Sequence, residues 1–309
     1  MSTTTSARVK AFCAAVIWGA SFVATKAAVG EISPVTLIFL RFGIGVVVLA
    51  FAVWRLRVFK MVSRRDWLLL MLLGAIGIPI HQGLQANGLV VTAATSVAWL
   101  VALTPVFTAL LAWLFLSESF GTMKTLGLII AFLGAIIVIS KGSFSADLLR
   151  LPSTTGDFLA LASAINWAIF TVISKPLLKR LHPTLMIAYV MAIGWIFVLP
   201  FLVSAQGWNE LSRLTIGGWL AVAFLGVFCS GIAYIFWFDA LAHIDASQVS
   251  AFIYLEPFVT VAVASVLLSE PFTLITFAGG LTILLGVYLV NRSSASRAAD
   301  QTKVPVATD

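Results

Sequence analysis

The chain has 309 residues, of which 61% are hydrophobic and 10% are charged, and its formal net charge is +7. A soluble globular domain carries about 25% charged residues, so this composition, with a mean hydropathy of +1.08, excludes a soluble protein and indicates an integral membrane protein. Its apolar runs are continuous rather than alternating, which argues against a β-barrel.

From the N-terminus, residues 1–8 form a short polar segment rich in Ser and Thr. Lys10 and Arg8 before the first apolar run resemble the start of a signal peptide, but Lys26 within the run and its match to a later segment predict a retained helix. Runs of about 20 residues can cross a hydrocarbon core about 30 Å thick. The sequence predicts ten such helices, at residues 10–29, 34–54, 66–88, 93–116, 121–140, 157–176, 184–204, 215–239, 246–268 and 272–291. The small polar residues 292–309 are predicted to form a disordered tail.

Basic residues are unevenly distributed among the predicted loops. With a cytoplasmic N-terminus, the outer side receives Lys141, Arg150 and Arg213, and the inner side receives the larger group of Arg8, Lys10, Arg55, Arg57, Lys60, Arg64, Arg65, Lys124, Lys179, Arg180, Arg292, Arg297 and Lys303. This is the positive-inside pattern, and it predicts that both termini are cytoplasmic. The positive charge therefore reports topology, and no nucleic-acid partner is expected.

A motif in the middle of the chain recurs near its end. Pro105 is followed thirteen residues later by Glu118, and Pro257 is followed thirteen residues later by Glu270. The same shift of 152 residues aligns Trp67 with Trp219, Gly127 with Gly279 and Gly134 with Gly286, and a shift of 149 aligns Trp18 with Trp167 and Lys26 with Lys175. The chain therefore divides into two five-helix repeats, at residues 9–140 and 157–291, joined by an external linker at 141–156.

An odd number of helices in each repeat makes the second repeat enter the membrane from the opposite side. Inverted repeats are typical of transporters, in which a site near the bilayer midplane lies between the two halves and is exposed to each side in turn.

Several motifs carry a resemblance to a known family. The first predicted helix contains Trp18-Gly19-Ala20-Ser21-Phe22 followed by Lys26, and the second contains Leu40-Arg41-Phe42. With the duplicated proline-to-glutamate helices, these residues resemble the EamA-type drug/metabolite transporter superfamily over roughly residues 10–291. The second copy of the first-helix pattern departs from it, reading Asn166-Trp167-Ala168. The resemblance implies ten transmembrane helices, a bacterial inner membrane and export of amino acids or other small metabolites.

Ionisable side chains within membrane helices are costly and are candidate functional residues. Inverted symmetry predicts two equivalent gate pairs, Lys26 with Glu270 near the outer face and Lys175 with Glu118 near the inner face. Alternating access would break one pair while the other forms. The competing interpretation is that these side chains simply reach the membrane interface.

Arg41 and Glu256 are predicted at comparable depth, and neither is repeated in the other half. We expect them to belong to a central site or to support it, and a purely structural buried pair is the alternative. His81 and Gln85 share a helical face because they are four residues apart. His81 and Glu256 are candidates for coupling transport to protons.

Aromatic residues are expected to complete an amphipathic cavity able to hold a zwitterion with an apolar side chain. The candidates are Trp18, Trp99, Trp167, Tyr234, Trp237 and Tyr254. Trp and Tyr are also common at membrane interfaces, which is the alternative role for each. Pro105 and Pro257 lack a backbone donor and are predicted to kink their helices, shaping a cavity or a hinge.

The sequence therefore predicts a secondary exporter of amino acids or related compounds, monomeric or homodimeric, with no cofactor and no metal. A carrier of nucleotide sugars or phosphorylated metabolites is the alternative, although a phosphate would call for clustered Lys and Arg at the midplane. An intramembrane enzyme is a different class, but the chain shows no nucleophile, carboxylate pair or metal cluster suited to one.

Overall fold

The computed structural model describes residues 3–116, 122–140, 155–244, 249, 251–270 and 273–301, and every regular element within these ranges is helical. The elements up to residue 140 are α1 Thr3–Ala28, α2 Pro34–Leu56, α3 Arg64–Ala75, η1 Ile76–Ile80, α4 His81–Val91, α5 Ala94–Val101, α6 Thr104–Leu116 and α7 Thr122–Ser140. The later ones are α8 Thr155–Leu178, α9 Pro183–Ser204, η3 Gly207–Arg213, α10 Ile216–Phe224, η4 Leu225–Ile232, α11 Ala233–His243, η5 Ala251–Leu255, α13 Glu256–Leu267 and α14 Leu274–Gln301.

Six helical segments are long and apolar enough to cross a membrane: Thr3–Ala28, Pro34–Leu56, Arg64–Val91, Thr155–Leu178, Pro183–Ser204 and Ile216–His243. They coincide with six of the predicted spans. Shorter apolar helices, at Ala94–Thr108, Thr125–Val138, Phe252–Leu267 and Leu274–Gly286, lie at the other four. The prediction of a helical membrane protein is confirmed for the described residues.

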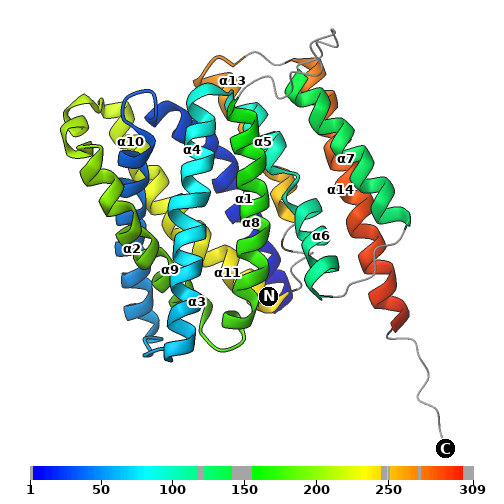
Figure 1. Ribbon diagram of the computed structural model, residues 1–309, viewed down its shortest axis with the longest axis horizontal. Coiled ribbons are helices and arrows are strands. Elements are labelled where there is room, and N and C mark those ends of the chain that lie inside the picture. The colour runs from blue at the N-terminus through cyan, green and yellow to red at the C-terminus, as the bar shows by residue number, and fades with distance from the viewer. Residues whose placement is uncertain are drawn as a thin grey trace, which may run out of the picture.

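The helices form a bundle in which α7 and α14 lie side by side at one edge (Figure 1). α1 packs against α11 and α13, whereas α8 packs against α4 and α6. Under the repeat, α1 corresponds to α8, α11 to α4 and α13 to α6, so the contacts of α1 with the second half have their counterpart in the contacts of α8 with the first half. α2 packs against α9, its own counterpart.

Two long helices contain wider turns at matching places. η1 and η4 are π-helical, and a shift of 152 residues moves Ile76–Ile80 onto 228–232, inside Leu225–Ile232. Such π-helical segments occur often at functional sites. In both halves the helix continues directly after this turn, as α4 and as α11.

Pro105 and Pro257 lie at helix starts rather than at kinks within helices. Pro105 is the second residue of α6, after a turn at Ala102 and Leu103 that separates it from α5. Pro257 is the second residue of α13, which follows η5. Because a proline in the first turn removes no intrahelical hydrogen bond, each one marks a break between two helical segments.

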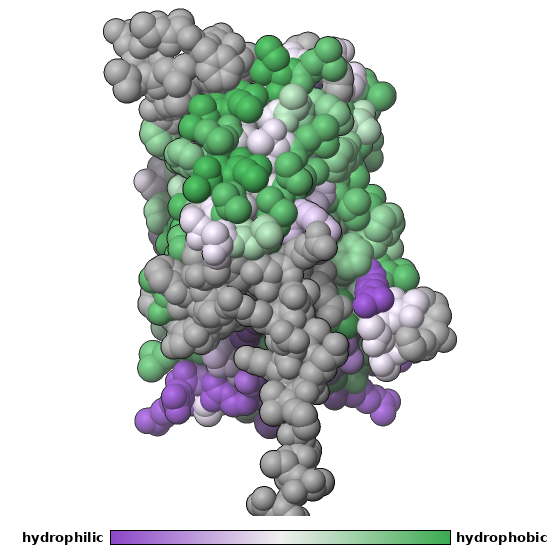
Figure 2. Space-filling model, turned by 90° about the vertical axis from the view of Figure 1, so that its right-hand side faces the viewer, coloured by the Kyte–Doolittle hydropathy of each residue, from purple (hydrophilic) through white to green (hydrophobic). Residues whose placement is uncertain are grey.

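Large apolar side chains remain exposed around the bundle, for example Val47, Phe51, Leu133 and Leu285, as expected for a surface that faces lipid. From the side of α7 and α14, the visible surface is mostly hydrophobic, and hydrophilic residues gather near the end where the N-terminus lies (Figure 2). α14 extends to Gln301, so residues 292–301 are helical, in contrast to the disordered tail expected from residue 292.

Candidate functional site

A buried pocket lies where the two halves of the bundle meet. α1 contributes Trp18, Ser21 and Phe22, and α4 contributes His81, Gln82 and Gln85. One residue each comes from six further elements: Arg41, Val101, Trp167, Tyr234, Ile253 and Glu256. The cavity volume is about 50 Å³. A water molecule needs roughly 10–15 Å³ on this measure, so the pocket has room for a few water molecules, and a larger ligand requires it to widen.

Arg41 is the basic group of this pocket, and it is 3% exposed. Its Nε donates to Oγ of Ser230 at 3.1 Å, and a terminal nitrogen donates to Oε1 of Gln82 at 3.4 Å. The guanidinium carbon lies 5.1 Å from the ring centre of Phe42. A guanidinium has five N–H donors, so these two bonds hold Arg41 in place and leave donors for a ligand.

Glu256 is the acidic group of the pocket and is 4% exposed. It is the first residue of α13, and no described residue donates a hydrogen bond to its carboxyl group. The hydroxyl of Thr260 donates to the backbone carbonyls of Gly19 at 2.7 Å and Glu256 at 2.8 Å, which ties α13 to α1. Although Arg41 and Glu256 line one pocket, no ion pair joins these two described residues. Both charges therefore face the pocket without neutralising each other directly.

His81 is fixed by its backbone partner. Its Nδ1 lies 3.1 Å from the carbonyl oxygen of Ser163, so Nδ1 carries the hydrogen and donates. In the neutral imidazole the other nitrogen, Nε2, is then an acceptor. The ring lies 5.0 Å from Trp167, centre to centre. His81 therefore offers an oriented polar edge beside an aromatic surface.

Trp18 is the centre of the aromatic cluster. Its ring centre lies 5.7 Å from that of Trp167, 5.3 Å from Tyr234 and 5.1 Å from Trp237. Its Nε1 donates to the carbonyl of Cys229 in η4 at 3.1 Å. This bond orients the indole of Trp18, and it connects the π-helical segment η4 to the pocket.

Seven of the ten residues predicted for a substrate cavity line this pocket: Trp18, Arg41, His81, Gln85, Trp167, Tyr234 and Glu256. Trp237 packs behind Trp18 and is not in the lining. Trp99 and Tyr254 belong to a different hydrophobic cluster, and Trp99 lines a second pocket. Their positions in the middle of predicted helices gave no information about which face of the helix they occupy.

Gln82 and Ser230 hold Arg41, although neither is among the predicted site residues. Gln82 is the immediate neighbour of His81, and Ser230 interrupts an otherwise apolar segment. A polar residue deep in a predicted span was the available signal for both. In the described part of the chain, no group of three or more His, Cys, Asp and Glu residues is suited to hold a metal ion.

The predicted gate partners Lys26 and Glu270 are found at the same end of the bundle, but each binds the backbone. Nζ of Lys26 donates to the carbonyls of Leu89 at 2.7 Å and Thr92 at 2.9 Å. The Glu270 carboxylate accepts from the backbone nitrogens of Ala94 at 2.8 Å and Thr95 at 3.2 Å. Lys26 thus holds the end of α4 and Glu270 holds the start of α5.

For the second predicted gate pair, Lys175 with Glu118, the structure describes only Lys175. Lys175 is exposed on α8, and Glu118 lies outside the described residues. At the end of the bundle where the N-terminus lies, Lys10 forms an ion pair with Asp239 at 2.7 Å, and Arg180 forms one with Asp66 at 2.9 Å. These two pairs join α1 to α11, and the end of α8 to the start of α3.

Long apolar helices around a buried pocket indicate a multi-pass membrane protein. The chain belongs to the EamA-like transporter family, whose model matches residues 6–140 and 154–292. This assignment confirms the family resemblance carried by the sequence motifs.

Three similar proteins are also named as transporters or exporters. An uncharacterized transporter of Archaeoglobus fulgidus is 32% identical over 277 residues, which cover 88% of this chain and 93% of that protein. The uncharacterized transporter YvbV of Bacillus subtilis is 30% identical, with 92% and 91% covered. A probable terminal-alkyne amino-acid exporter of Streptantibioticus cattleyicolor is 29% identical, with 91% and 92% covered.

A solved crystal structure shares the fold. It superposes with a TM-score of 0.67 at 19% sequence identity, covering 92% of this chain and 98% of the other. The helical arrangement is therefore one already seen in an experimental structure.

Proposed function

We propose that this protein is a secondary exporter of amino acids or closely related zwitterions, working by alternating access around the pocket of Arg41 and Glu256. The observation that carries the proposal is that these two buried, oppositely charged groups share one pocket without pairing with each other. Leaving a buried charge uncompensated is costly. A zwitterion reduces that cost because its carboxylate can pair with Arg41 and its ammonium with Glu256.

The rest of the pocket suits the side chain of such a substrate. Trp18, Trp167 and Tyr234 provide large aromatic surfaces, and His81 and Gln85 provide polar contacts. Small-molecule sites commonly combine a mainly apolar wall with a few placed polar groups. The probable amino-acid exporter among the relatives is consistent with this substrate class.

We also propose that the chain crosses the membrane ten times as two inverted repeats, with both termini in the cytoplasm of a bacterial cell. The paired contacts of α1 and α8 support this arrangement, as do the matching π-helical turns. The pocket would then be exposed to each side as the halves rearrange.

Coupling to protons is a further part of the proposal. Glu256 receives no hydrogen bond from a described side chain, so a proton and a substrate ammonium can compete for its carboxylate. Such competition would exchange substrate for proton, and the export that remains in Glu256→Gln should be insensitive to a proton uncoupler.

Efflux of amino acids from preloaded cells tests the proposal. Arg41→Met and Glu256→Gln should each lower export at least tenfold, because each removes one charge that binds the substrate, and the double variant should stay inactive. Arg180→Gln is the matched control, since Arg180 forms an ion pair at the edge of the bundle.

Two results would overturn the proposal. Recovery of export in the double variant would show that Arg41 and Glu256 only balance each other's charge. Proteoliposomes that move a phosphorylated metabolite but no amino acid would favour the alternative carrier.

A further inference from the structure

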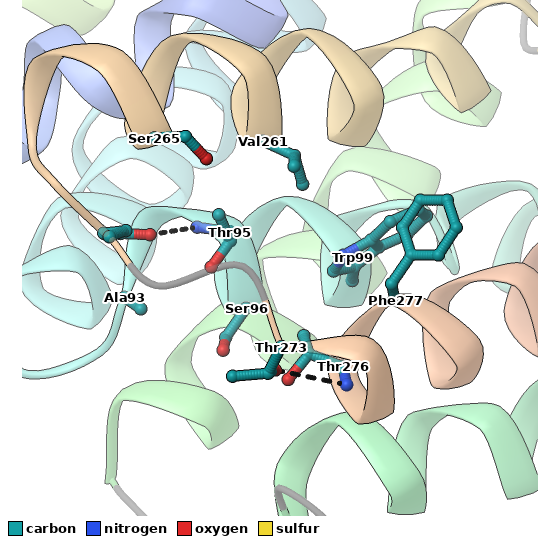
Figure 3. A pocket seen from close by; sticks show the side chains of 10 residues that line it. Ala93, Thr95, Ser96, Trp99, Val261, Ser265, Thr273, Thr276 and Phe277 are labelled. Atoms are coloured by element: carbon teal, nitrogen blue, oxygen red, sulfur yellow. Dashed lines mark hydrogen bonds between the residues drawn. The ribbon is translucent and has the colours of Figure 1, made fainter.

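A second pocket, of about 160 Å³, lies between α5, α13 and α14. Three apolar side chains, Trp99, Val261 and Phe277, form one part of its wall (Figure 3). Hydroxyl groups form another part, contributed by Thr95, Ser96, Ser265, Thr273 and Thr276. Glu270 is its charged residue, so the lining is acidic and contains no Lys or Arg.

Trp99 carries an unused hydrogen-bond donor at this pocket. The residue is 0% exposed, and its Nε1 has no hydrogen-bond partner among the described residues. In Figure 3 the nitrogen lies on the side of the indole away from Phe277. A buried donor without a partner costs roughly 1–3 kcal/mol, so a ligand with an acceptor atom at this point would gain from binding there.

Glu270 is held at the edge of the pocket by the backbone of α5. Its two oxygens accept from the nitrogens of Ala94 and Thr95, one each. A carboxylate offers about four lone-pair sites, so further donors can still approach. The group is therefore a fixed acceptor toward the pocket.

The second pocket adjoins the first along two helices. On α13, Glu256 lines the first pocket, and Val261 and Ser265 line the second, five and nine residues further on. At 1.5 Å per residue these are steps of roughly 8 and 14 Å. On α5, Val101 faces the first pocket and Trp99 the second. The second pocket thus lies between the first and the end of the bundle held by Lys26.

We propose that the second pocket is a binding site for an organic ammonium that also carries a neutral hydrogen-bond acceptor and an apolar group. The ammonium would donate to Glu270 and the hydroxyls, the acceptor would bind the N–H of Trp99, and the apolar group would pack on Trp99 and Phe277. In contrast to the first pocket, no guanidinium is present to favour a carboxylate. The site rests on the proposed function only in that it would be a second stop for an amino-acid-like substrate.

Phenylalaninol, a primary ammonium with a neutral hydroxyl group, is the probe. Its binding is measured by calorimetry on the full chain in phosphatidylglycerol nanodiscs, which contain no lipid amine. Ser265→Ala/Thr276→Val and Trp99→Phe should each weaken binding about fivefold or more, because each removes hydrogen-bonding groups from the site. N-acetylphenylalaninol, which lacks the ammonium, should not bind.

Two variants serve as controls. Thr282 lies on α14 outside the lining of the second pocket, so Thr282→Val should bind phenylalaninol as tightly as the wild type does. Arg41→Met should change phenylalaninol binding less than twofold while weakening phenylalanine binding. If instead Arg41→Met abolishes phenylalaninol binding and the Ser265→Ala/Thr276→Val variant, folded by its Tm, binds normally, the second site does not exist.

The two proposals fail differently. Loss of phenylalaninol binding in the second-pocket variants without any amino-acid export would support the site and overturn the proposed function. Export that depends on Arg41, with phenylalaninol binding insensitive to the second-pocket variants, would support the proposed function and overturn the second site. If phosphatidylethanolamine added to the nanodiscs displaces phenylalaninol, a lipid headgroup is the source of the ammonium.

Discussion

Lys26 and Glu270 hold complementary ends of two consecutive helices. Lys26 binds carbonyls at the end of α4, and Glu270 binds N–H groups at the start of α5. Each charge also has the favourable sign for the helix dipole at its end. If Lys26 and Glu270 formed an ion pair with each other, exchanging the two residues would keep the pair. Because each binds backbone atoms instead, the exchange would place each charge against backbone groups of the wrong polarity.

We therefore expect the exchange Lys26→Glu/Glu270→Lys to be less stable than either Lys26→Met or Glu270→Gln. The exchange places a carboxylate against carbonyl oxygens and an ammonium against N–H groups. Each single variant should lose about 1.5–3 kcal/mol, the range for hydrogen bonds to charged groups. Thermal unfolding of the full chain in detergent measures these differences.

Lys10 and Asp239 provide the control, because their side chains pair directly at 2.7 Å. The exchange Lys10→Asp/Asp239→Lys keeps that pair and should stay within about 1 kcal/mol of the wild type. A Lys26 and Glu270 exchange that restores stability in the same way would contradict backbone binding.

Glu210, in the connection η3, is a test of pH dependence outside the membrane spans. Burial raises the pKa of Glu210, but hydrogen bonds from the backbone and hydroxyl of Ser33 and from Thr36, with the charge of Arg213, outweigh it and hold the pKa below 4.5. A lowered pKa means that the carboxylate stabilises the fold above the pKa of the unfolded state, and that this is lost as the pH falls through the folded pKa.

Glu210→Gln should accordingly lower the Tm by a constant amount between pH 7 and 5, and by less below pH 4.5. Thermal unfolding of both proteins across this range gives the difference. A difference that grows on acidification would show that Glu210 is not held as a carboxylate by Ser33.

At the scale of the elements, α7 and α14 pack through glycines. A Cβ on Gly134 would lie 2.6 Å from the backbone nitrogen of Ile283 and 2.7 Å from the carbonyl oxygen of Gly279. Small residues allow such close approach of membrane helices. These glycines therefore allow α7 and α14 to pack closely against each other within one chain.

Gly134→Ala should destabilise the protein by about 1–3 kcal/mol, because the added methyl group forces the two backbones apart. Gly83→Ala is the matched control. Gly83 also lies in a helix, α4, and a Cβ at this position would have no neighbouring atom within 4 Å. The control should leave the Tm unchanged or raise it, as alanine favours helix by up to about 1 kcal/mol. Equal losses in both variants would argue against tight α7–α14 packing.

At the scale of the whole molecule, the loop before α3 and the connection η3 lie at opposite ends of α2. Met61 is 74% exposed in the former and Trp208 is 48% exposed in the latter. Hydrogen bonds from Ser33 to Glu210 fix η3 at the start of α2. The 23 residues of α2 span roughly 34 Å at 1.5 Å each, which is enough to cross a bilayer.

Cysteine labelling tests the predicted orientation. In a Cys13→Ser/Cys229→Ala background, a membrane-impermeant maleimide added to intact cells should label Trp208→Cys but not Met61→Cys, and inverted vesicles should give the opposite result. Labelling of Met61→Cys in intact cells would reverse the orientation inferred from the basic loops.

Much of the fold could be predicted because membrane spans depend on local composition. The apolar runs located every described α-helix, although not the short helix η3, and the repeat identified the matched pairs of helices. The prolines were more difficult, since Pro105 and Pro257 are compatible with either a kink or a new helix start. Packing of the neighbouring helices decides between these, and it is not encoded within the motif.

The sequence by itself determined the membrane class, the α-helices and the family, and it selected Arg41 and Glu256 as candidate site residues, since a charge in an apolar run stands out at any position. Only the tertiary structure decided which aromatic residues reach the pocket, that Arg41 is held by Ser230 and Gln82, and that Lys26 and Glu270 bind backbone atoms. Hydropathy reports depth in the membrane, whereas partners depend on the direction in which each side chain leaves its helix and on which helix lies opposite.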